Sequence, residues 1–240
     1  MEEEQHGNFM IMDSLIKAKL NKVKNNFTIE NLFYQKVHQS RIYKILNQFD
    51  ILKKSSLVKG MIVEAGVLNG NSLLRLGIFR DYLCMQNKKL IGFDAFGAFP
   101  DSYKKTKKKI LKKELNFSTI HDKNTGNGKT KKFISNLLKS KNIKNFSLVE
   151  GDVLSTIDTF IKKEKRLKIS FLHLDMDVYL PTLVTLEKFY NFLSKNAVVV
   201  IDDYNTHPGA TQATKEFILK KKLKINVIKN VRSSYYFIKK

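Results

Sequence analysis

Residues 168–203 read KISFLHLDMDVYLPTLVTLEKFYNFLSKNAVVVIDD, and this stretch decides the fold. Two short apolar runs, 168–175 and 197–203, have the length of buried strands, and each ends at an aspartate. Between them, residues 182–194 space apolar side chains at three and four positions, which predicts a helix. A strand, a helix and a second strand in this order predict two parallel strands joined by a helical crossover.

The same alternation continues on both sides of this stretch. Further strands are predicted at about 60–65, 88–94 and 145–152, and further helices at 71–84, 129–141, 155–164 and 211–221. Strands predicted at 224–230 and 233–240 are close enough in sequence to form an antiparallel hairpin. We therefore predict an α/β domain over 58–240, with a mostly parallel sheet covered by helices on both faces. Residues 1–57 are predicted to form a helical extension or lid.

The chain length and the cysteine content narrow the class of protein. A chain of 240 residues suits one sizeable α/β domain with a helical extension. Cys84 is the only cysteine, which excludes an intrachain disulfide and a cysteine-based metal cluster. No apolar run has the roughly 18–20 residues of a membrane span, and the first residues are acidic, unlike a secretory signal. We expect a cytoplasmic protein.

The formal net charge is +22, which raises the question of an anionic partner. Only five of the basic residues are arginines, although readers of phosphates and bases usually rely on the arginine fork. The chain is rich in lysine, asparagine and isoleucine, and a genome rich in A and T explains this bias better than a binding surface for nucleic acid. A weak association with a membrane surface stays open. The basic run 104–113 fits a solvated surface, or a surface attracting the phosphates of a sugar nucleotide or of glycan-bearing lipids.

Ligands of open α/β sheets bind beyond the carboxyl ends of the strands, so the residues there are the candidates for function. Gly66 and Gly70 follow the first predicted strand and allow a tight turn close to a ligand. The three-glycine dinucleotide pattern and a phosphate-binding Lys-Ser/Thr pair are both absent from the sequence, which argues against NAD and ATP. Glu64 suits a cationic or amine-bearing ligand, and Asp94 suits ribose hydroxyls. Asp152 ends the third strand, and each acid taken alone also fits a helix cap or a surface charge.

Four aspartates follow the fourth and fifth predicted strands. Asp175 and Asp177 are two residues apart, so their side chains can reach one face, and Asp202 and Asp203 end the next strand. If these strands are neighbours about 4.8 Å apart, four carboxylates would repel one another strongly. A hard cation such as Mg²⁺ or Ca²⁺ removes the repulsion, so we predict a metal site that uses two or three of them.

Two histidines lie near these aspartates in the sequence. His173 alternates with the aspartates, and we expect it in the core. His207 lies in the loop after the fifth strand, and we expect it to contact either the metal ligands or the substrate.

Five segments occur in the order found in a known family of enzymes. They are GMIVEAGVLNGNS at 60–72, IGFDAFGAFPD at 91–101, FSLVEGDVLSTI at 146–157, LHLDMDVYLPT at 172–182 and VVIDDYNTHPGATQATKEF at 199–217. Over roughly 35–220 the chain resembles the macrocin-type O-methyltransferases, which use S-adenosylmethionine and a metal ion to methylate sugars of macrolide and aminocoumarin antibiotics. The D-x-D-x-Y block followed by D-D-Y is the more specific part of this resemblance, and the glycine turn alone is not specific.

The resemblance implies a class I, Rossmann-like methyltransferase fold with seven strands, and it implies roles for particular residues. Residues around S-adenosylmethionine would be Glu64, Gly66, Gly70, Ser72 and Asp94, with Asp152 near the adenine end. Asp175, Asp202 and Asp203 would hold Mg²⁺, and Asp177 would be the general base. The family further implies a bacterial enzyme and a homodimer.

The acceptor is left open by the sequence. The leading hypothesis is a hydroxyl of a sugar, a glycan or a secondary metabolite, and the second is a catechol or another phenol. A nucleic-acid-binding protein or an RNA methyltransferase is disfavoured, because N-P-P-Y-type and cysteine-based catalytic motifs are absent from the sequence. A non-catalytic interaction module is disfavoured by the complete set of carboxylates.

Overall fold

The computed structural model describes residues 26–102, 114, 127–228 and 234–240. The chain divides into two compact units, Met1–Tyr43 and Lys44–Lys240. In the first unit, helix α2 spans Asn26–Lys36, and helix α3, Gln39–Lys53, begins in the first unit and ends in the second. Residues 1–25 and the basic run 104–113 lie outside the described residues, and the predicted domain boundary between residues 57 and 58 stays a prediction.

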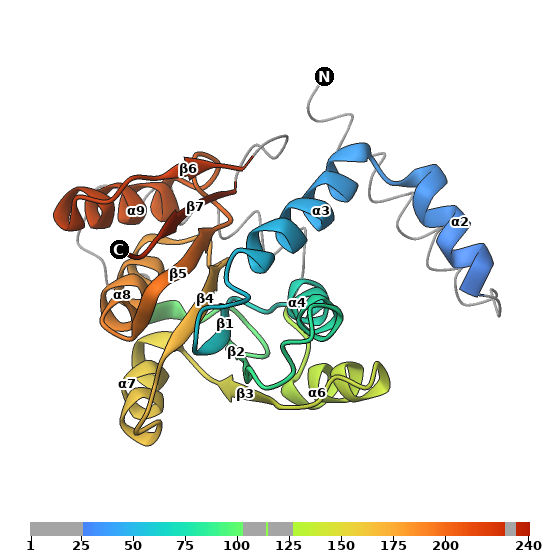
Figure 1. The fold of residues 1–240 in the computed structure, drawn as a ribbon, viewed down its shortest axis with the longest axis horizontal. Coiled ribbons are helices and arrows are strands. Elements are labelled where there is room, and N and C mark those ends of the chain that lie inside the picture. The colour runs from blue at the N-terminus through green and yellow to red at the C-terminus, as the bar shows by residue number, and fades with distance from the viewer. Residues whose placement is uncertain (1–25, 103–113, 115–126, 229–233) are drawn as a thin grey trace. The chain divides into compact units, whose positions relative to one another are not determined.

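The second unit is built on a sheet with the strand order β3-β2-β1-β4-β5-β7-β6 (Figure 1). The strands are β1 Met61–Ala65, β2 Leu90–Asp94, β3 Phe146–Glu150, β4 Ile169–Leu174, β5 Leu193–Ile201, β6 Asn226–Val227 and β7 Tyr235–Ile238. Strands β1 to β5 pair in parallel, whereas β7 pairs antiparallel with both β5 and β6. The predicted α/β fold with an antiparallel C-terminal hairpin is therefore confirmed.

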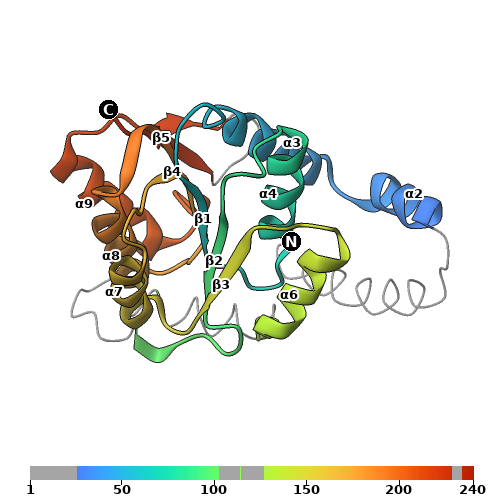
Figure 2. The same cartoon turned by 60° about the horizontal axis from the view of Figure 1, so that its bottom comes forward.

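Helices cover both faces of this sheet (Figures 1 and 2). The further helices are α4 Asn71–Tyr82, α6 Lys131–Ser140, α7 Val153–Lys163, α8 Tyr179–Tyr190 and α9 Pro208–Lys221. One core cluster joins strand residues such as Phe93 to Phe160 of α7, Phe189 of α8 and Phe217 of α9. A second cluster on the other face joins Phe171 of β4 to α3, α4 and α6. Ile51 and Leu52 of α3 thus belong to the core of the sheet domain.

The boundary between α8 and β5 differs from the prediction. The helical pattern predicted a helix over 182–194, whereas α8 begins at Tyr179 and β5 begins at Leu193. Pro181 lies in the first turn of α8, where the missing N–H is not needed. Leu193 pairs with Ile169 of β4, and the register then shifts before Phe171 pairs with Val198. Pairing with β4 overrides the helical spacing at this point, and spacing alone does not reveal that pairing.

The register of the sheet sets the position of the site. Ala65 of β1 pairs with Phe93 of β2 and with Leu174 of β4, and Leu174 pairs with Ile201 of β5. The carboxyl ends of these four parallel strands are therefore level with one another. The residues directly after these paired positions lie together at the carboxyl ends of the strands; they are Gly66, Asp94, Asp175 and Asp202.

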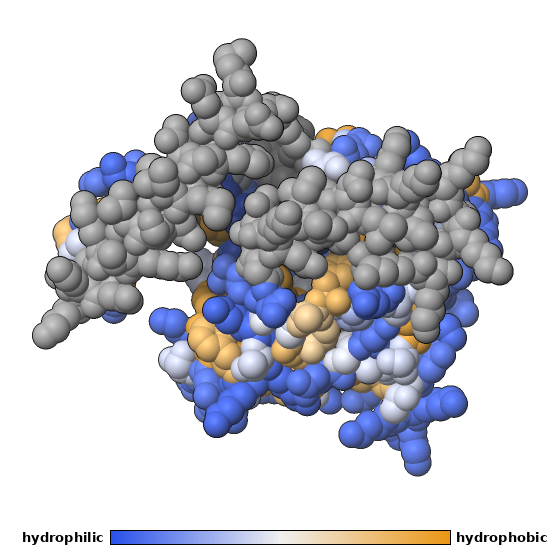
Figure 3. All heavy atoms as spheres, turned by 180° about the vertical axis from the view of Figure 1, so that it is seen from behind, coloured by the Kyte–Doolittle hydropathy of each residue, from blue (hydrophilic) through white to orange (hydrophobic). Residues whose placement is uncertain are grey.

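The described surface is consistent with a lysine-rich chain. Hydrophilic residues cover most of the described surface in Figure 3, with apolar residues in patches between them. None of the helices in the described ranges combines the length and the apolar character that crossing a lipid bilayer requires.

Candidate active site

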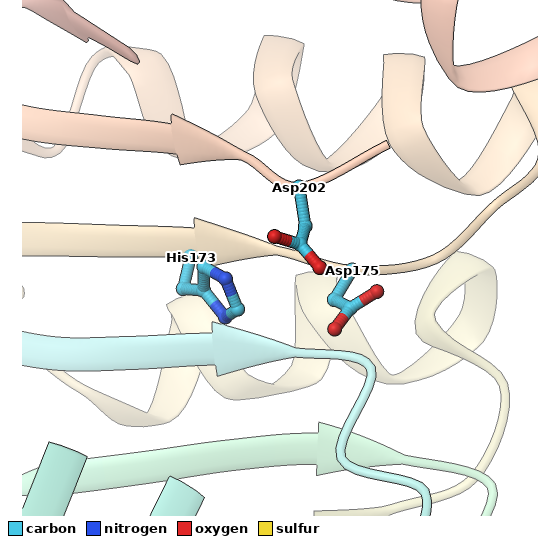
Figure 4. Close-up of side chains that lie close together, drawn as sticks. All are labelled: His173, Asp175 and Asp202. Carbon is cyan, nitrogen blue, oxygen red and sulfur yellow. The ribbon is translucent and has the colours of Figure 1, made fainter. Parts of the chain in front are cut away.

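The carboxyl end of β4 carries the first cluster of candidate ligands. His173 and Asp175 come from the end of β4, and Asp202 directly follows β5 (Figure 4). One ligand atom from each side chain lies within 4.8 Å of the others. Burial, followed by the charges of Asp202 and Asp203, raises the pKa of Asp175 well above its ordinary value. Acidic groups packed in this way favour the binding of a cation.

Asp202 is held by two donors of the protein. Lys44 Nζ lies 2.5 Å from Asp202 Oδ2, and Ser234 Oγ donates a hydrogen bond of 2.5 Å to Asp202 Oδ1. Burial alone would raise the pKa of Asp202, but the positive charge of Lys44, together with His173 and these hydrogen bonds, lowers it to about 2. Asp202 is therefore ionised although it is buried at the carboxyl end of β5.

A second cluster joins the other two aspartates to a histidine. His207 Nδ1 lies 3.0 Å from Asp203 Oδ1, and His207 Nε2 lies 3.5 Å from Asp177 Oδ1. The backbone N–H of Asp177 donates to Asp203 Oδ2 over 3.2 Å, and Asp177 has a φ of 63°. Burial, and then the charge of Asp203, raises the pKa of Asp177 to about 8. Burial opposes a raised pKa for His207, but the hydrogen bond to Asp203 and the surrounding carboxylates still raise it.

The predicted metal ligands are thus divided between two clusters. Asp175 and Asp202 lie together, whereas Asp203 lies with Asp177 and His207. The charges of the other three aspartates all raise the pKa of Asp175, so the four carboxylates converge on one region. His207 lies beside Asp177 and Asp203, and its predicted contact with the metal ligands or the substrate stays a prediction.

Sequence reasoning missed Lys44 and Ser234. Both contact Asp202, from positions 158 and 32 residues away in the chain. Neither belongs to a recognisable motif, and only the folded sheet brings them to the site. The sequence contains no signal that would have found them.

The glycine turn after β1 passes directly beside the aspartate segment. Gly66 has a φ of 93°, and a Cβ atom there would lie 1.7 Å from the carbonyl oxygen of Asp175. Gly70 has a φ of 80° and forms the N-cap of α4. Both positions require glycine, because a side chain would be strained and would collide with neighbouring atoms. The turn therefore lies in contact with the backbone that carries the acidic residues.

Glu64 is fully buried at the end of β1. Ser72 Oγ of α4 donates to Glu64 Oε1, and His173 Nδ1 lies 2.8 Å from the same oxygen. Among the described residues, none forms a hydrogen bond with Glu64 Oε2. A buried carboxylate oxygen without a partner is costly, so Glu64 fits a ligand that brings a donor or a positive charge. His173, expected in the core, is buried as predicted and links Glu64 to the first aspartate cluster.

Asp94 organises the loops around the glycine turn. Its Oδ2 accepts hydrogen bonds from the backbone N–H groups of Val67, at 2.7 Å, and Leu68, at 2.9 Å. Its Oδ1 accepts one from Phe96 N–H at 2.7 Å. Asp94 thus fixes the shape of the loop that is predicted to surround the cofactor, and its predicted contact with ribose hydroxyls stays a prediction.

Asp152 forms a helix cap in the structure. It is the N-cap residue of α7, and its side chain accepts a 2.9 Å hydrogen bond from the backbone N–H of Leu154. The sequence left this role open beside a cofactor contact. The predicted position of Asp152 near the adenine end of the cofactor stays a prediction.

Comparison with solved structures shows that this fold is shared. The structure of the O-methyltransferase NovP matches with a TM-score of 0.70 and 20% identity, covering 82% of this chain and 80% of the other. CalS11, a TDP-rhamnose 3'-O-methyltransferase of calicheamicin biosynthesis, matches with a TM-score of 0.66 and 19% identity, covering 94% and 91% of the two chains. An O-methyltransferase from Bacillus cereus, solved with S-adenosylhomocysteine, has a TM-score of 0.53 and 13% identity, covering 89% and 86%. No curated protein matches the sequence.

The strand order and these structural likenesses show the Rossmann-like fold that these O-methyltransferases share. The chain belongs to the macrocin O-methyltransferase (TylF) family, whose model matches residues 30–239. It is therefore an O-methyltransferase, as the sequence predicts.

Proposed function

We propose that this enzyme transfers a methyl group from S-adenosylmethionine to a sugar hydroxyl, and that the transfer depends on Mg²⁺. One observation carries the proposal: the aspartates after β4 and β5 converge beside the glycine turn of β1, with Gly66 against Asp175. A donor site and a cation site would thus adjoin one another. Membership of the macrocin family supports a sugar acceptor, and so does CalS11, a structural neighbour named for TDP-rhamnose.

The chain has residues that fit the cofactor. S-adenosylmethionine supplies an electrophilic methyl group on a positively charged sulfur. Gly66 and Gly70, both at positive φ, form the tight turn after β1, and Asp94 holds that turn in place. Glu64, near the carboxyl end of β1, offers the buried carboxylate oxygen Oε2, and the hydrogen bond from Ser72 fixes the orientation of its side chain. We infer that these residues surround the cofactor.

The acidic residues fit a divalent cation. Asp175, Asp202 and Asp203 would hold Mg²⁺, which supplies positive charge that makes an acceptor hydroxyl easier to deprotonate. The raised pKa of Asp175 supports this role, because burial and then repulsion from Asp202 and Asp203 disfavour its charged form, and a bound cation would offset both effects.

Asp177 is proposed as the general base. Burial, and then the charge of Asp203, raises its pKa to about 8, so the carboxyl exchanges a proton near neutral pH. His207 lies beside the Asp177 carboxylate, and the hydrogen bond from the Asp177 backbone N–H to Asp203 fixes the turn that carries the side chain. Asp177 would accept the proton of the acceptor hydroxyl while the surrounding residues keep that oxygen in line with the methyl group.

Labelled methyl transfer tests the proposal. Purified enzyme would be incubated with S-adenosylmethionine carrying a labelled methyl group, and with a panel of nucleotide sugars, free glycosides and catechols. We expect incorporation into a sugar, loss of activity after exhaustive chelation, and recovery on addition of Mg²⁺. Activity confined to catechols would replace the sugar acceptor, and full activity after chelation would remove the cation. The homodimeric state, the cytoplasmic location and the weak membrane-surface association stay predictions.

A further inference from the structure

Asp202 has a cation of the protein itself as its partner. Lys44 Nζ lies 2.5 Å from Asp202 Oδ2, while Ser234 Oγ donates to Oδ1 over 2.5 Å. The Asp202 side chain is 7% exposed and the Lys44 side chain 25% exposed, so this ion pair is largely shielded from water. Both oxygens of a proposed metal ligand therefore already have protein donors.

The position of Lys44 is set by helix α3. Ile51 and Leu52, later in the same helix, are buried in the core, which anchors this part of α3 on the sheet domain. A cavity of about 20 Å³ lies beside the ion pair, and its lining combines polar residues such as Asn47 and Gln48 with the apolar residues Ile51, Phe171, Val200 and Ile228. The Lys44 side chain is 25% exposed, so its ammonium group can turn toward solvent when Asp202 takes a different partner.

We propose that Lys44 is a built-in counter-cation that competes with the divalent cation for Asp202. The inference rests on the proposed function, because it assumes that Asp202 is a metal ligand. Two positive ions beside one carboxylate repel each other, so Lys44 must give up Oδ2 when the metal binds through that atom. Lys44 consequently stabilises the metal-free protein, in which it compensates a buried charge, and lowers the affinity for the metal.

Two other roles for Lys44 would give different results. If Lys44 only orients Asp202 for the metal, its removal weakens cation binding. If Asp202 is not a ligand, removal of Lys44 changes stability and leaves cation binding unchanged. The sign of the change in Mg²⁺ affinity therefore separates the three roles.

The experiment compares Lys44→Met with the wild type and with Lys188→Met. Lys188 pairs with Asp158 at 2.8 Å on the outer side of α7 and α8, so this variant removes a comparable but exposed ion pair. Mg²⁺ would be titrated into metal-stripped protein by calorimetry, and the melting temperature would be recorded with and without Mg²⁺. For Lys44→Met we expect a lower melting temperature without metal and an affinity for Mg²⁺ raised by about tenfold, the order expected when a unit charge is removed near a divalent ion.

Two further variants keep the test decisive. Lys44→Gln retains a donor for Asp202 without the charge, and it replaces Lys44→Met should that variant fail to fold. Lys44→Arg retains the charge and should bind Mg²⁺ much as the wild type does. Unchanged or weaker binding in the neutral variants would overturn the inference, as would an equal gain in Lys188→Met. A wild type that binds no Mg²⁺ would instead overturn the proposed function.

Discussion

At the scale of single residues, Asp177 and Asp203 show how the backbone prepares the site. Asp177 adopts a φ of 63°, and its N–H contacts the carboxylate of Asp203. Left-handed backbone is uncommon for residues other than glycine, although aspartate tolerates it better than most. The turn places the two carboxylates on either side of His207, so the candidate base and a candidate metal ligand share one neighbour.

The exchange Asp177→Asn tests the base at this scale. The amide keeps the size of the side chain but cannot take up the proton of the substrate hydroxyl, so we expect kcat to fall by about 10²–10⁴-fold. Binding of S-adenosylhomocysteine, measured by calorimetry, should stay close to that of the wild type, because Asp177 belongs to the aspartate clusters and not to the glycine turn. Asp158→Asn, on the exposed side of α7, is the matched control and should keep full activity. Normal turnover of Asp177→Asn would exclude this residue as the base.

The sequence reveals some of these residues and hides others. The four aspartates stand at the ends of two predicted strands, so the alternation of elements is enough to place them at one edge. Their division into two clusters depends on side-chain directions after the strands end, where strand periodicity no longer applies. Lys44 was hidden because nothing in its own helix distinguishes it from the many other lysines of the chain.

At the scale of elements, most strands and helices follow from apolar periodicity. The exceptions lie where a tertiary contact decides, as at Leu193, which joins β5 through its pairing with Ile169. Asp152 gives a second example, because a strand-end acid and a helix cap have the same appearance in sequence. The hydrogen bond from Leu154 N–H shows that this aspartate caps the N-terminus of α7.

The cap predicts a measurable effect on stability. Asp152→Ala should lower the free energy of unfolding by about 1 kcal/mol, because the first turn of α7 loses an acceptor for its N–H groups. Asp152→Asn keeps a capping oxygen and should lose much less. Urea denaturation of the two variants and the wild type measures both values. Equal losses in the two variants would contradict a capping role.

At the scale of the whole molecule, the buried acidic residues link stability to pH. In the metal-free protein the pKa of Asp177 is raised from 3.8 to about 8, by burial and then by the charge of Asp203. Between these values the folded protein keeps a proton that the unfolded chain has released, so the folded state loses stability as pH rises. The raised pKa of His207 acts in the same direction, because its contribution is also lost as pH rises.

We therefore expect the urea concentration at the midpoint of unfolding of metal-stripped protein to fall as the pH is raised from about 5 to about 8. The measurement is a series of denaturation curves in chelator-containing buffers over this range. Asp177→Asn should reduce the slope, because this group no longer titrates. A midpoint that rises with pH would show that the carboxyl of Asp177 does not hold its proton in the folded protein.

The contact between Gly66 and Asp175 has a consequence for the catalytic cycle. Asp175 N–H donates to the carbonyl of Ala65 over 2.9 Å, and the next residue, Gly66, lies against the Asp175 carbonyl. Because backbone touches backbone here, the turn after the first strand and the segment after the fourth can shift only in concert. Binding of a ligand at the glycine turn would therefore alter the affinity of the aspartate segment for its own ligand. Thermodynamic reciprocity requires the effect to be equal in both directions. Methyl donor and metal ion would then assemble on the enzyme as cooperative ligands.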